Sequence, residues 1–259
     1  RQRQMCIRDS FIAVMAVGMT GIIVMGGIDL SIGSIYALAG VVGAMVLHWL
    51  EANYPGISGW KSIPAGVGVC CAIGALCGLV NGVATVGLRV HPFIITLGGM
   101  AVFRGIAFVT TEGQSIGNFP DSFTAGGFKL PSIGGNETAA TYAGITVGKV
   151  KVALFVIVGA LAGLSAAIKC GYFGGSSSGD GSGYELRVIA AAVVGGASLS
   201  GGRGSVIGAM LGAIIMQLID NGIIVLEIDS NYTNIVIGLA IVLAVVVDQT
   251  KARFIKRRH

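Results

Sequence analysis

Long, uninterrupted blocks of apolar residues constrain this sequence more than any other feature. Several blocks reach the roughly 18 to 20 residues that cross the hydrocarbon layer of a membrane as an α-helix. Over the whole chain, 54% of the residues are hydrophobic and 11% are charged, against about 25% charged in an ordinary soluble domain. A soluble core of 259 residues cannot hold this much apolar side chain. The sequence therefore predicts an all-α fold, a polytopic transmembrane helix bundle.

The blocks predict about seven or eight membrane spans. Those of roughly spanning length are residues 11–28, 32–50, 63–88, 92–110, 152–170, 206–226 and 235–247. A shorter apolar piece, residues 188–198, lies between the glycine-rich strings GGSSSGDGSG and GGASLSGGRGS. Irregular backbone at membrane depth must be buried in protein or line a water-filled cavity. We therefore expect residues 188–198 to form a broken or re-entrant helix beside a translocation pathway.

Both ends of the chain differ in composition from the apolar blocks. The first ten residues, RQRQMCIRDS, lack the apolar stretch of a secretory signal, and we expect residues 1–10 to be a non-native or mistranslated leader. The last nine residues hold five Lys or Arg side chains, typical of the cytoplasmic flank of a final span. The expected organisation is a leader (1–10), a transmembrane domain (11–250) and a basic cytoplasmic tail (251–259).

The polar residues argue against nucleic acid, metals, cofactors and catalysis. The net charge of +5 comes largely from the basic tail, and the basic residues form no stripe that would follow a nucleic acid. The five cysteines mostly lie in apolar blocks and have no metal-type pairing with histidine. The sequence contains neither G-x-x-x-x-G-K-[ST] nor H-E-x-x-H. We expect a protein that is not an enzyme.

The membrane orientation inferred from the basic tail and the one inferred from Arg89 and His91 disagree in the middle of the chain. If the tail is cytoplasmic, residues 201–205, Lys149 and Lys151 are inside and residues 171–183 are outside. Arg89 and His91 also read as cytoplasmic, which leaves Thr111 outside. The polar stretch after Thr111 must then return inside without an apolar run of spanning length. Either a helix is missing near residues 127–131, or the block 92–110 does not cross fully.

Four strings, taken in order, resemble the permease family of ribose/xylose/arabinose-type (monosaccharide) ABC importers. They are VGMTGIIVMGGIDLSIGSIYALAG, NGVATVGLRVHPFIITLGGMAVFRGIA, IGGNETAATYAGI and GSGYELRVIAAAVVGGASLSGGRGSVIGAMLGAIIMQLIDNGI. The resemblance covers nearly all of residues 11–249. Family members carry one further span ahead of the GGNE string and another ahead of VGMT. The resemblance therefore implies a truncated chain with an internal deletion.

The resemblance also implies the function. The expected protein is the multi-pass permease subunit of a bacterial ABC importer that moves a monosaccharide across the inner membrane, with a pentose such as xylose or ribose favoured. The TEGQSIGNFPDSF stretch resembles the xylose and multiple-monosaccharide subgroup. The expected partners are a separate ABC ATPase subunit, a periplasmic or lipid-anchored sugar-binding protein, and a second permease copy, identical or paralogous. The alternatives are an ABC permease for nucleosides or branched-chain amino acids, or an ion-coupled secondary transporter.

The GGNE string resembles the short cytoplasmic helix through which ABC permeases dock on their ATPase. The residues implied in this coupling loop are Gly134, Gly135, Asn136, Glu137, Ala139, Ala140 and Gly144. Small residues allow close docking, and an asparagine followed by an acidic residue suits a helix N-terminus. A capped surface helix without a partner is the alternative.

Polar residues inside apolar blocks are the candidates for the translocation pathway, because such groups are costly in a membrane unless they are paired or functional. They are Asp29, Asn81, Arg104, Tyr184, Glu185 and Asn221. Asp29 also fits the N-cap of the helix after it, and Arg104 fits a side chain that snorkels to an interface. Asn81, Gln217, Asp220 and Asn221 fit interhelical hydrogen bonds. Arg187 stands where the family more often has an acidic residue, which leaves charge pairing there open.

Overall fold

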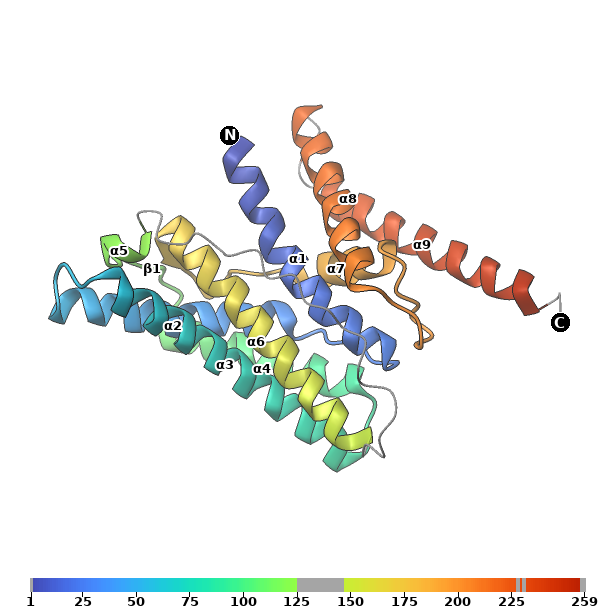
Figure 1. The fold of residues 1–259 in the computed structure, drawn as a ribbon, viewed down its shortest axis with the longest axis horizontal. Helices are drawn as coiled ribbons and strands as arrows, with labels where there is room; N and C mark the ends of the chain where they lie inside the picture. The colour runs from blue at the N-terminus through green and yellow to red at the C-terminus, as the bar shows by residue number, and fades with distance from the viewer. Residues whose placement is uncertain (1, 125–146, 227–228, 230–231, 257–259) are drawn as a thin grey trace.

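The structure is a computed structural model that describes residues 2–124, 147–226, 229 and 232–256. Figure 1 shows long helices throughout, and the only strands among these residues are two of two residues each. The helices are α1 (Gln2–Val24), α2 (Ile32–Asn53), α3 (Gly59–Leu88), α4 (Pro92–Thr111), α5 (Asp121–Thr124), α6 (Val147–Phe173), α7 (Tyr184–Val194), α8 (Val206–Val225) and α9 (Tyr232–Lys256), and the strands are β1 (Ile116–Gly117) and β2 (Gly175–Ser176).

The predicted spans are confirmed as helices with shifted ends. In the part of the chain that the structure describes, five helices are long and apolar enough to cross a membrane, namely α2, α3, α4, α6 and α8. Two shorter apolar stretches, Phe11–Val24 and Ile235–Val246, lie in α1 and α9. Helix α1 ends at Val24 rather than at residue 28, because Gly26 takes a φ of 74° and donates its N–H to the carbonyl of Ile23.

Glycines bring α3 and α6 together over their length. Gly74 lies against Gly159 and Gly78 against Phe155, so the residue numbers rise along α3 as they fall along α6. The two helices are therefore antiparallel, and a Cβ added at Gly74 would overlap the backbone of α6. Such small-residue faces let helices associate in lipid through van der Waals contact. The glycines spread through the apolar blocks are used here as helix-packing surfaces.

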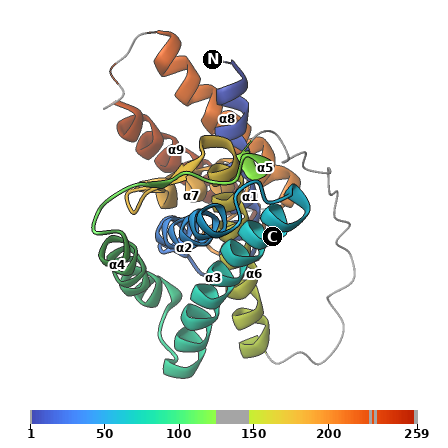
Figure 2. The same cartoon turned by 90° about the vertical axis from the view of Figure 1, so that its left-hand side faces the viewer.

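Helix α2 is the central helix and α4 is peripheral. Of their apolar windows, 72% is buried for α2 and 17% for α4. Helix α2 packs on α3, α4 and α6, whereas α1 contacts α6, α7 and α8. Figure 2 shows α4 standing apart from the other helices, beside α2 and α3. Contacts between α4 and the rest of the chain are consequently few, and its polar side chains matter for its placement.

One end of the bundle, called here the basic end, is marked by the turn between α3 and α4. Gly148 packs against Val86, so α6 starts where α3 finishes. The turn after α7 lies at the same end, since Gly202 donates its N–H to the carbonyl of Val24 at the end of α1 (2.8 Å). This end therefore collects Arg89, Lys149, Lys151 and Arg203, which the sequence predicted to lie on one side. The positive-inside pattern predicts that this is the cytoplasmic end.

The opposite end, called the sheet end, is where α4 and α6 finish. Strand β1 follows α4 and pairs antiparallel with β2, which follows α6, with Ile116 opposite Ser176. Ser122 of α5 bonds to the hydroxyl of Ser62 near the start of α3 (2.8 Å). Residues 112–124 therefore lie at the sheet end, whereas residue 147 lies at the basic end.

The mismatch in membrane orientation that the sequence predicted is also present in the structure. Helix α4 runs 20 residues between the basic end and the sheet end, so the explanation in which it stops short is wrong. The chain leaves α5 at the sheet end and enters α6 at the basic end. The predicted position of a missing helix, residues 127–131, lies outside the described residues.

Helix α7 confirms the broken helix predicted at residues 188–198, although it begins earlier, at Tyr184, and ends at Val194. It has 11 residues, about 16 Å of helix, or roughly half of a membrane crossing. The segment before it, residues 174–183, is non-helical apart from turns and enters the bundle from the sheet end. The expectation that residues 1–10 are a leader stays a prediction; α1 includes residues 2–10.

Candidate functional site

The candidate pathway residues gather around the first turn of α2, in the middle of the bundle. Asp29 and Asn81 lie on one side of this turn, and Tyr184 and Glu185 lie on the other. The turn is deeply placed, with Ile32, Gly33, Ser34, Ile35 and Tyr36 all buried. Two helix starts meet here, because α7 also begins beside it. Sequence spacing alone gave no reason for these residues to meet.

Asp29 sits in the non-helical stretch between α1 and α2. Its Oδ1 accepts from the backbone N–H of Ser31 (2.8 Å) and from the Ser31 hydroxyl (2.5 Å). Asn81 of α3 donates its side-chain amide to the same hydroxyl (2.7 Å). The cap position of α2 belongs to Ser31 rather than to Asp29, yet Asp29 satisfies an N–H two residues ahead, as an N-cap does. Its Oδ2 is buried without a hydrogen-bond partner among the described residues.

Thr96 of α4 completes this side of the turn. Its hydroxyl donates to the carbonyl of Ile28 (3.2 Å) and accepts from the N–H of Leu30 (3.1 Å). Backbone groups in this irregular stretch would otherwise lack partners inside the membrane. Ser31 and Thr96 were not singled out from the sequence, because a lone hydroxyl in an apolar block gives no distinguishing signal.

Tyr184 and Glu185, the first residues of α7, approach the same turn from the other side. The ring of Tyr184 lies 5.4 Å from that of Tyr36, centroid to centroid, with the planes inclined by 49°. The carboxylate of Glu185 lies against Gly33, where a Cβ would stand 2.6 Å from Oε2. A Cβ there would also overlap the backbone carbonyl oxygen of Gly181, which cannot move aside as a side chain can, so only glycine fits at position 33. Tyr184 and Glu185 are half-buried, unlike Asp29 and Asn81 on the other side of the turn, which are fully buried.

Arg104 of α4 neither snorkels to an interface nor stands free. Its Nη1 donates to the carbonyls of Ser178 (2.8 Å) and Asp180 (2.5 Å). The carboxylate of Glu185 is near enough to interact electrostatically with the guanidinium. Arg104 thus ties the peripheral helix α4 to the non-helical segment before α7.

Lys169 and Asp180 form an ion pair that the sequence reading missed. The Nζ of Lys169 lies 2.5 Å from Oδ2 of Asp180, and the two side chains are 16% and 21% exposed. The same Asp180 oxygen accepts from the Ser176 hydroxyl (3.1 Å) and the Ser177 N–H (2.8 Å). The available signal was a lysine near the end of an apolar block followed by a single acidic residue in a glycine-serine string.

Asn221 lies apart from this group. It accepts from Gln217 one turn earlier in its own helix (3.3 Å) rather than from another helix. Its neighbour Asp220 pairs with Arg187 of α7 (2.6 Å). Arg187 therefore does have a charge partner, although the partner comes from α8. Asn81 and Asp220 therefore bond to residues outside their own helices, whereas the Gln217–Asn221 bond stays within α8.

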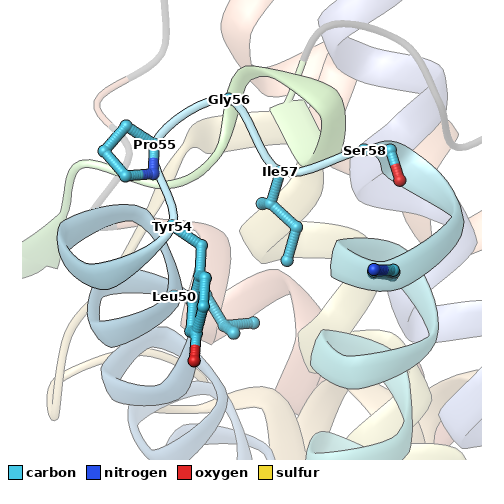
Figure 3. A pocket seen from close by; sticks show the side chains of 7 residues that line it. Leu50, Tyr54, Pro55, Gly56, Ile57 and Ser58 are labelled. Atoms are coloured by element: carbon cyan, nitrogen blue, oxygen red, sulfur yellow. The ribbon is translucent and has the colours of Figure 1, made fainter.

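Other candidate positions do not add to the cluster. The coupling-loop residues at 134–144 lie outside the described residues. The chain that the structure describes contains no group of three His, Cys, Asp or Glu placed to hold a metal ion. A hollow of about 550 Å³ lies at the α2–α3 turn, lined by residues that include Tyr54, Ile57 and Lys61 (Figure 3). It belongs to the sheet end, where exposed Trp49 and Trp60 suit a membrane interface.

Known proteins resemble this chain along most of its length. A family model described as "branched-chain amino acid transport system / permease component" matches residues 5–124 and 122–245. The ribose import permease protein of Escherichia coli (strain K12) is 35% identical over 274 residues, which cover 92% of this chain and 82% of that protein. No solved structure matches the chain.

Relatives with other named sugars match over the same extent. The ribose import permease protein of Bacillus subtilis (strain 168) is 34% identical over 273 residues, covering 92% of this chain and 81% of that protein. The D-allose transport system permease protein of Escherichia coli (strain K12) is 30% identical over 277 residues, covering 95% and 82%.

Proposed function

Because the chain belongs to the family described as branched-chain amino acid transport system / permease component, we infer that it moves a solute through the bilayer as one subunit of an importer. It is the permease of an ABC importer for a monosaccharide, since its relatives at 30–35% identity are ribose and D-allose permeases. It is a multi-pass protein of the bacterial inner membrane. The family description names amino acids, but the sugar relatives do not favour that alternative or an ion-coupled carrier.

The observation that carries the solute assignment is the match to sugar permeases over 92–95% of the chain. The finer statement, a pentose such as xylose or ribose, remains our proposal. The test is uptake of labelled ribose, xylose, allose and leucine in cells that lack their own permeases and carry this chain with candidate ATPase and sugar-binding proteins from the same genome. Uptake of ribose or xylose that stops when the ATPase is inactivated is expected. Uptake of leucine alone, or uptake without the ATPase, would contradict the assignment.

The proposed pathway follows the polar cluster at the first turn of α2. Tyr184 and Glu185 are the side chains that we place on it, because they are half-buried and stand where irregular backbone meets two helix starts. An aromatic ring beside a carboxylate suits a sugar, which offers C–H faces and hydroxyl groups. Asp29 and Asn81 are fully buried and hydrogen-bonded to Ser31, and we propose that they support the turn from behind.

ATP hydrolysis is proposed to reside on a separate ATPase subunit, which docks on residues Gly134, Gly135, Asn136, Glu137, Ala139, Ala140 and Gly144. Support comes from the start of α6, because Val147 and Gly148, the first described residues after this loop, lie at the basic end. Glu137→Lys or Gly144→Trp should leave membrane insertion intact and reduce co-purification of the ATPase, since reversed charge or bulk spoils a fitted groove. Unchanged co-purification in both variants would exclude this docking element.

We propose no catalytic role for the chain. Residues 175–179, GSSSG, have the G-x-S-x-G spacing of a nucleophile loop, but that motif needs a sharp turn from a strand into a helix. Here Ser177 precedes α7 by seven residues, and its hydroxyl accepts from the N–H of Gly179. The remaining proposed partners are a sugar-binding protein on the outer side and a second permease copy, identical or paralogous.

A further inference from the structure

The segment of residues 174–183, called the plug below, fills the outer half of the column whose inner half is helix α7. At its start, Ser176 lies against Gly40 of α2, and near its end Gly181 lies against Gly33. These positions are seven residues apart on α2, so the plug descends about 10 Å into the bundle. Non-helical backbone at this depth is tolerated where protein shields it or where it borders a water-filled route.

The plug has no apolar side chain. Its sequence is GGSSSGDGSG, so the van der Waals packing of apolar side chains, which holds the helices of this chain together, contributes almost nothing to its position. Polar contacts and the short β1–β2 pairing remain. A segment held in this way detaches when a few hydrogen bonds are exchanged, whereas a packed helix would have to leave its whole apolar face.

The polar contacts come from two different helices and converge on one residue. Lys169 of α6 binds the Asp180 carboxylate (2.5 Å) and the Gly175 carbonyl (2.9 Å). Arg104 of α4 binds the backbone carbonyls of Ser178 (2.8 Å) and Asp180 (2.5 Å). Charge-assisted bonds of this kind are the stronger class of hydrogen bonds. Both cations lie inside apolar helices, where an unpaired charge is costly. Loss of its partner is therefore unfavourable for either side chain.

One buried hydroxyl of the closed plug lacks a hydrogen-bond partner among the described residues. Ser178 is 1% exposed, and its hydroxyl has no hydrogen-bond partner among the described residues. A buried hydroxyl without a partner is unfavourable, and it would gain one on meeting water or a solute hydroxyl. The closed state is therefore held by the Asp180 contacts. The Ser178 hydroxyl, in contrast, gains a hydrogen bond when the plug meets water or a solute.

We propose that residues 174–183 are the outer gate of the translocation pathway, and that Asp180 is its latch, with Lys169 and Arg104 as positioning residues. The proposal rests on the proposed transport function. The gate opens when the Asp180 contacts are exchanged, and the plug then leaves the column above Tyr184 and Glu185. Arg104 acts through the plug backbone and does not contact the solute in the closed state.

The test uses a cysteine in place of Ser178 as a reporter, in the full chain with Cys6, Cys70, Cys71, Cys77 and Cys170 replaced by alanine. A membrane-impermeant thiol reagent is added from outside to intact cells. Asp180→Asn or Lys169→Gln should raise the rate of reporter labelling about tenfold or more, as expected when a charge-assisted bond is lost. The matched control is Asp121→Asn, the same change at the same end of the bundle on an exposed residue outside the plug. Exchange of the pair, Lys169→Asp with Asp180→Lys, should bring the rate back toward that of the parent.

A second reporter separates gating from unfolding. A protein that keeps only Cys70, which is fully buried between α3 and its neighbours, should label no faster with Asp180→Asn than without it. Equal labelling of the plug reporter in all variants, acceleration by Asp121→Asn to the same degree, or parallel exposure of Cys70 would each overturn the proposal. If Asp180→Asn does not accumulate, Lys169→Gln alone decides.

The labelling rates are measured without solute or ATPase, so they test the gate even if the solute assignment fails. In the assembled importer, modification of the plug reporter should abolish monosaccharide uptake while leaving the ATPase bound. Full uptake after complete modification would place the plug off the pathway and overturn the gate. Absence of monosaccharide uptake in the unmodified parent, with uptake of another solute, would instead count against the proposed function.

Discussion

At the residue scale, Asp29 illustrates how a carboxylate is accommodated in a membrane bundle. It is fully buried, and no cation lies within ion-pair distance among the described residues. One oxygen is saturated by the two Ser31 donors and the other has no partner. Asp29 therefore shapes the start of α2 through directed hydrogen bonds rather than through an ion pair.

Two substitutions of Asp29 should distinguish its role as a hydrogen-bond acceptor from its role as a negative charge. Asp29→Ala removes the acceptor for both Ser31 donors and should lower the free energy of unfolding by about 1–3 kcal/mol. Asp29→Asn keeps one oxygen acceptor without a buried charge, so its melting temperature in detergent should stay close to that of the parent. Asp121→Asn, on the surface, is the matched control. A loss for Asn as large as that for Ala would show that the negative charge itself is required.

At the scale of elements, the antiparallel pair α3–α6 organises the molecule. The α3 glycines that face α6 recur every fourth residue, at 74, 78 and 82, which puts them on one face of the helix. Lipid tails supply no hydrophobic force between these helices, so the closeness of the backbones determines how strongly they pack. Gly68 and Gly87 of α3 face open space and have no such role, whereas Gly66 packs against Phe123 of α5.

Two alanine substitutions in α3 should therefore act in opposite directions. Gly74→Ala pushes a Cβ into the backbone of Gly159 and should cost about 1–3 kcal/mol through overpacking. Gly68→Ala meets nothing within 4 Å and should stabilise the helix by about 0.5–1 kcal/mol. Thermal unfolding of the two purified variants in the same detergent checks this. Similar melting temperatures for both would mean that α3 and α6 are not packed as described.

At the scale of the whole molecule, charge distribution orients the bundle. The basic end carries Arg89, Lys149, Lys151 and Arg203, while the sheet end carries the acidic Glu51, Glu112 and Asp121 beside one exposed lysine, Lys61. In intact cells without native cysteines, a cysteine at Glu112 should react with an impermeant thiol reagent, whereas one at Arg203 should react only after the membrane is opened. Both side chains are exposed in the structure, so a difference in labelling reports the side of the membrane and not burial in the protein. The reverse pattern would invert the topology.

The connection between α5 and α6 carries the second prediction at this scale. The chain changes ends between residues 124 and 147, yet the intervening sequence contains no apolar run of spanning length. The alignment with the ribose permease of Escherichia coli extends over 274 residues, more than the 259 of this chain, so that alignment contains gaps in this chain. We propose that a spanning segment is missing here.

Replacing residues 125–146 with the corresponding, longer segment of that ribose permease should increase the amount of membrane-inserted, protease-resistant protein several-fold, because α4 and α6 then join through a regular span. A chimera of the same length in which that segment is scrambled to remove its apolar run serves as the control. Equal insertion of both chimeras and of the parent would show that no span is missing between these helices.

The sequence by itself determined the elements and their order. Apolar runs of spanning length require helix in a membrane because the backbone must satisfy its own hydrogen bonds there, so α2, α3, α4, α6 and α8 were predictable within a few residues. The broken helix was predictable for the same reason, since glycine-rich strings on both sides of residues 188–198 cannot continue a helix. Asp29, Tyr184 and Glu185 were recognisable as polar residues in costly positions.

Only the tertiary structure decided which polar groups meet. Arg104 is 74 residues from Ser178 in the chain, and Asn81 is 50 residues from Ser31, so no local period links either pair. The partner of Arg104 is a backbone carbonyl, a group that every residue carries and that sequence therefore cannot mark. Lys169 and Asp180 became a pair because the plug folds back beneath the end of α6. Helix identity follows from local hydrogen bonding, whereas the site follows from how α2, α4 and α6 enclose a segment that has no apolar face of its own.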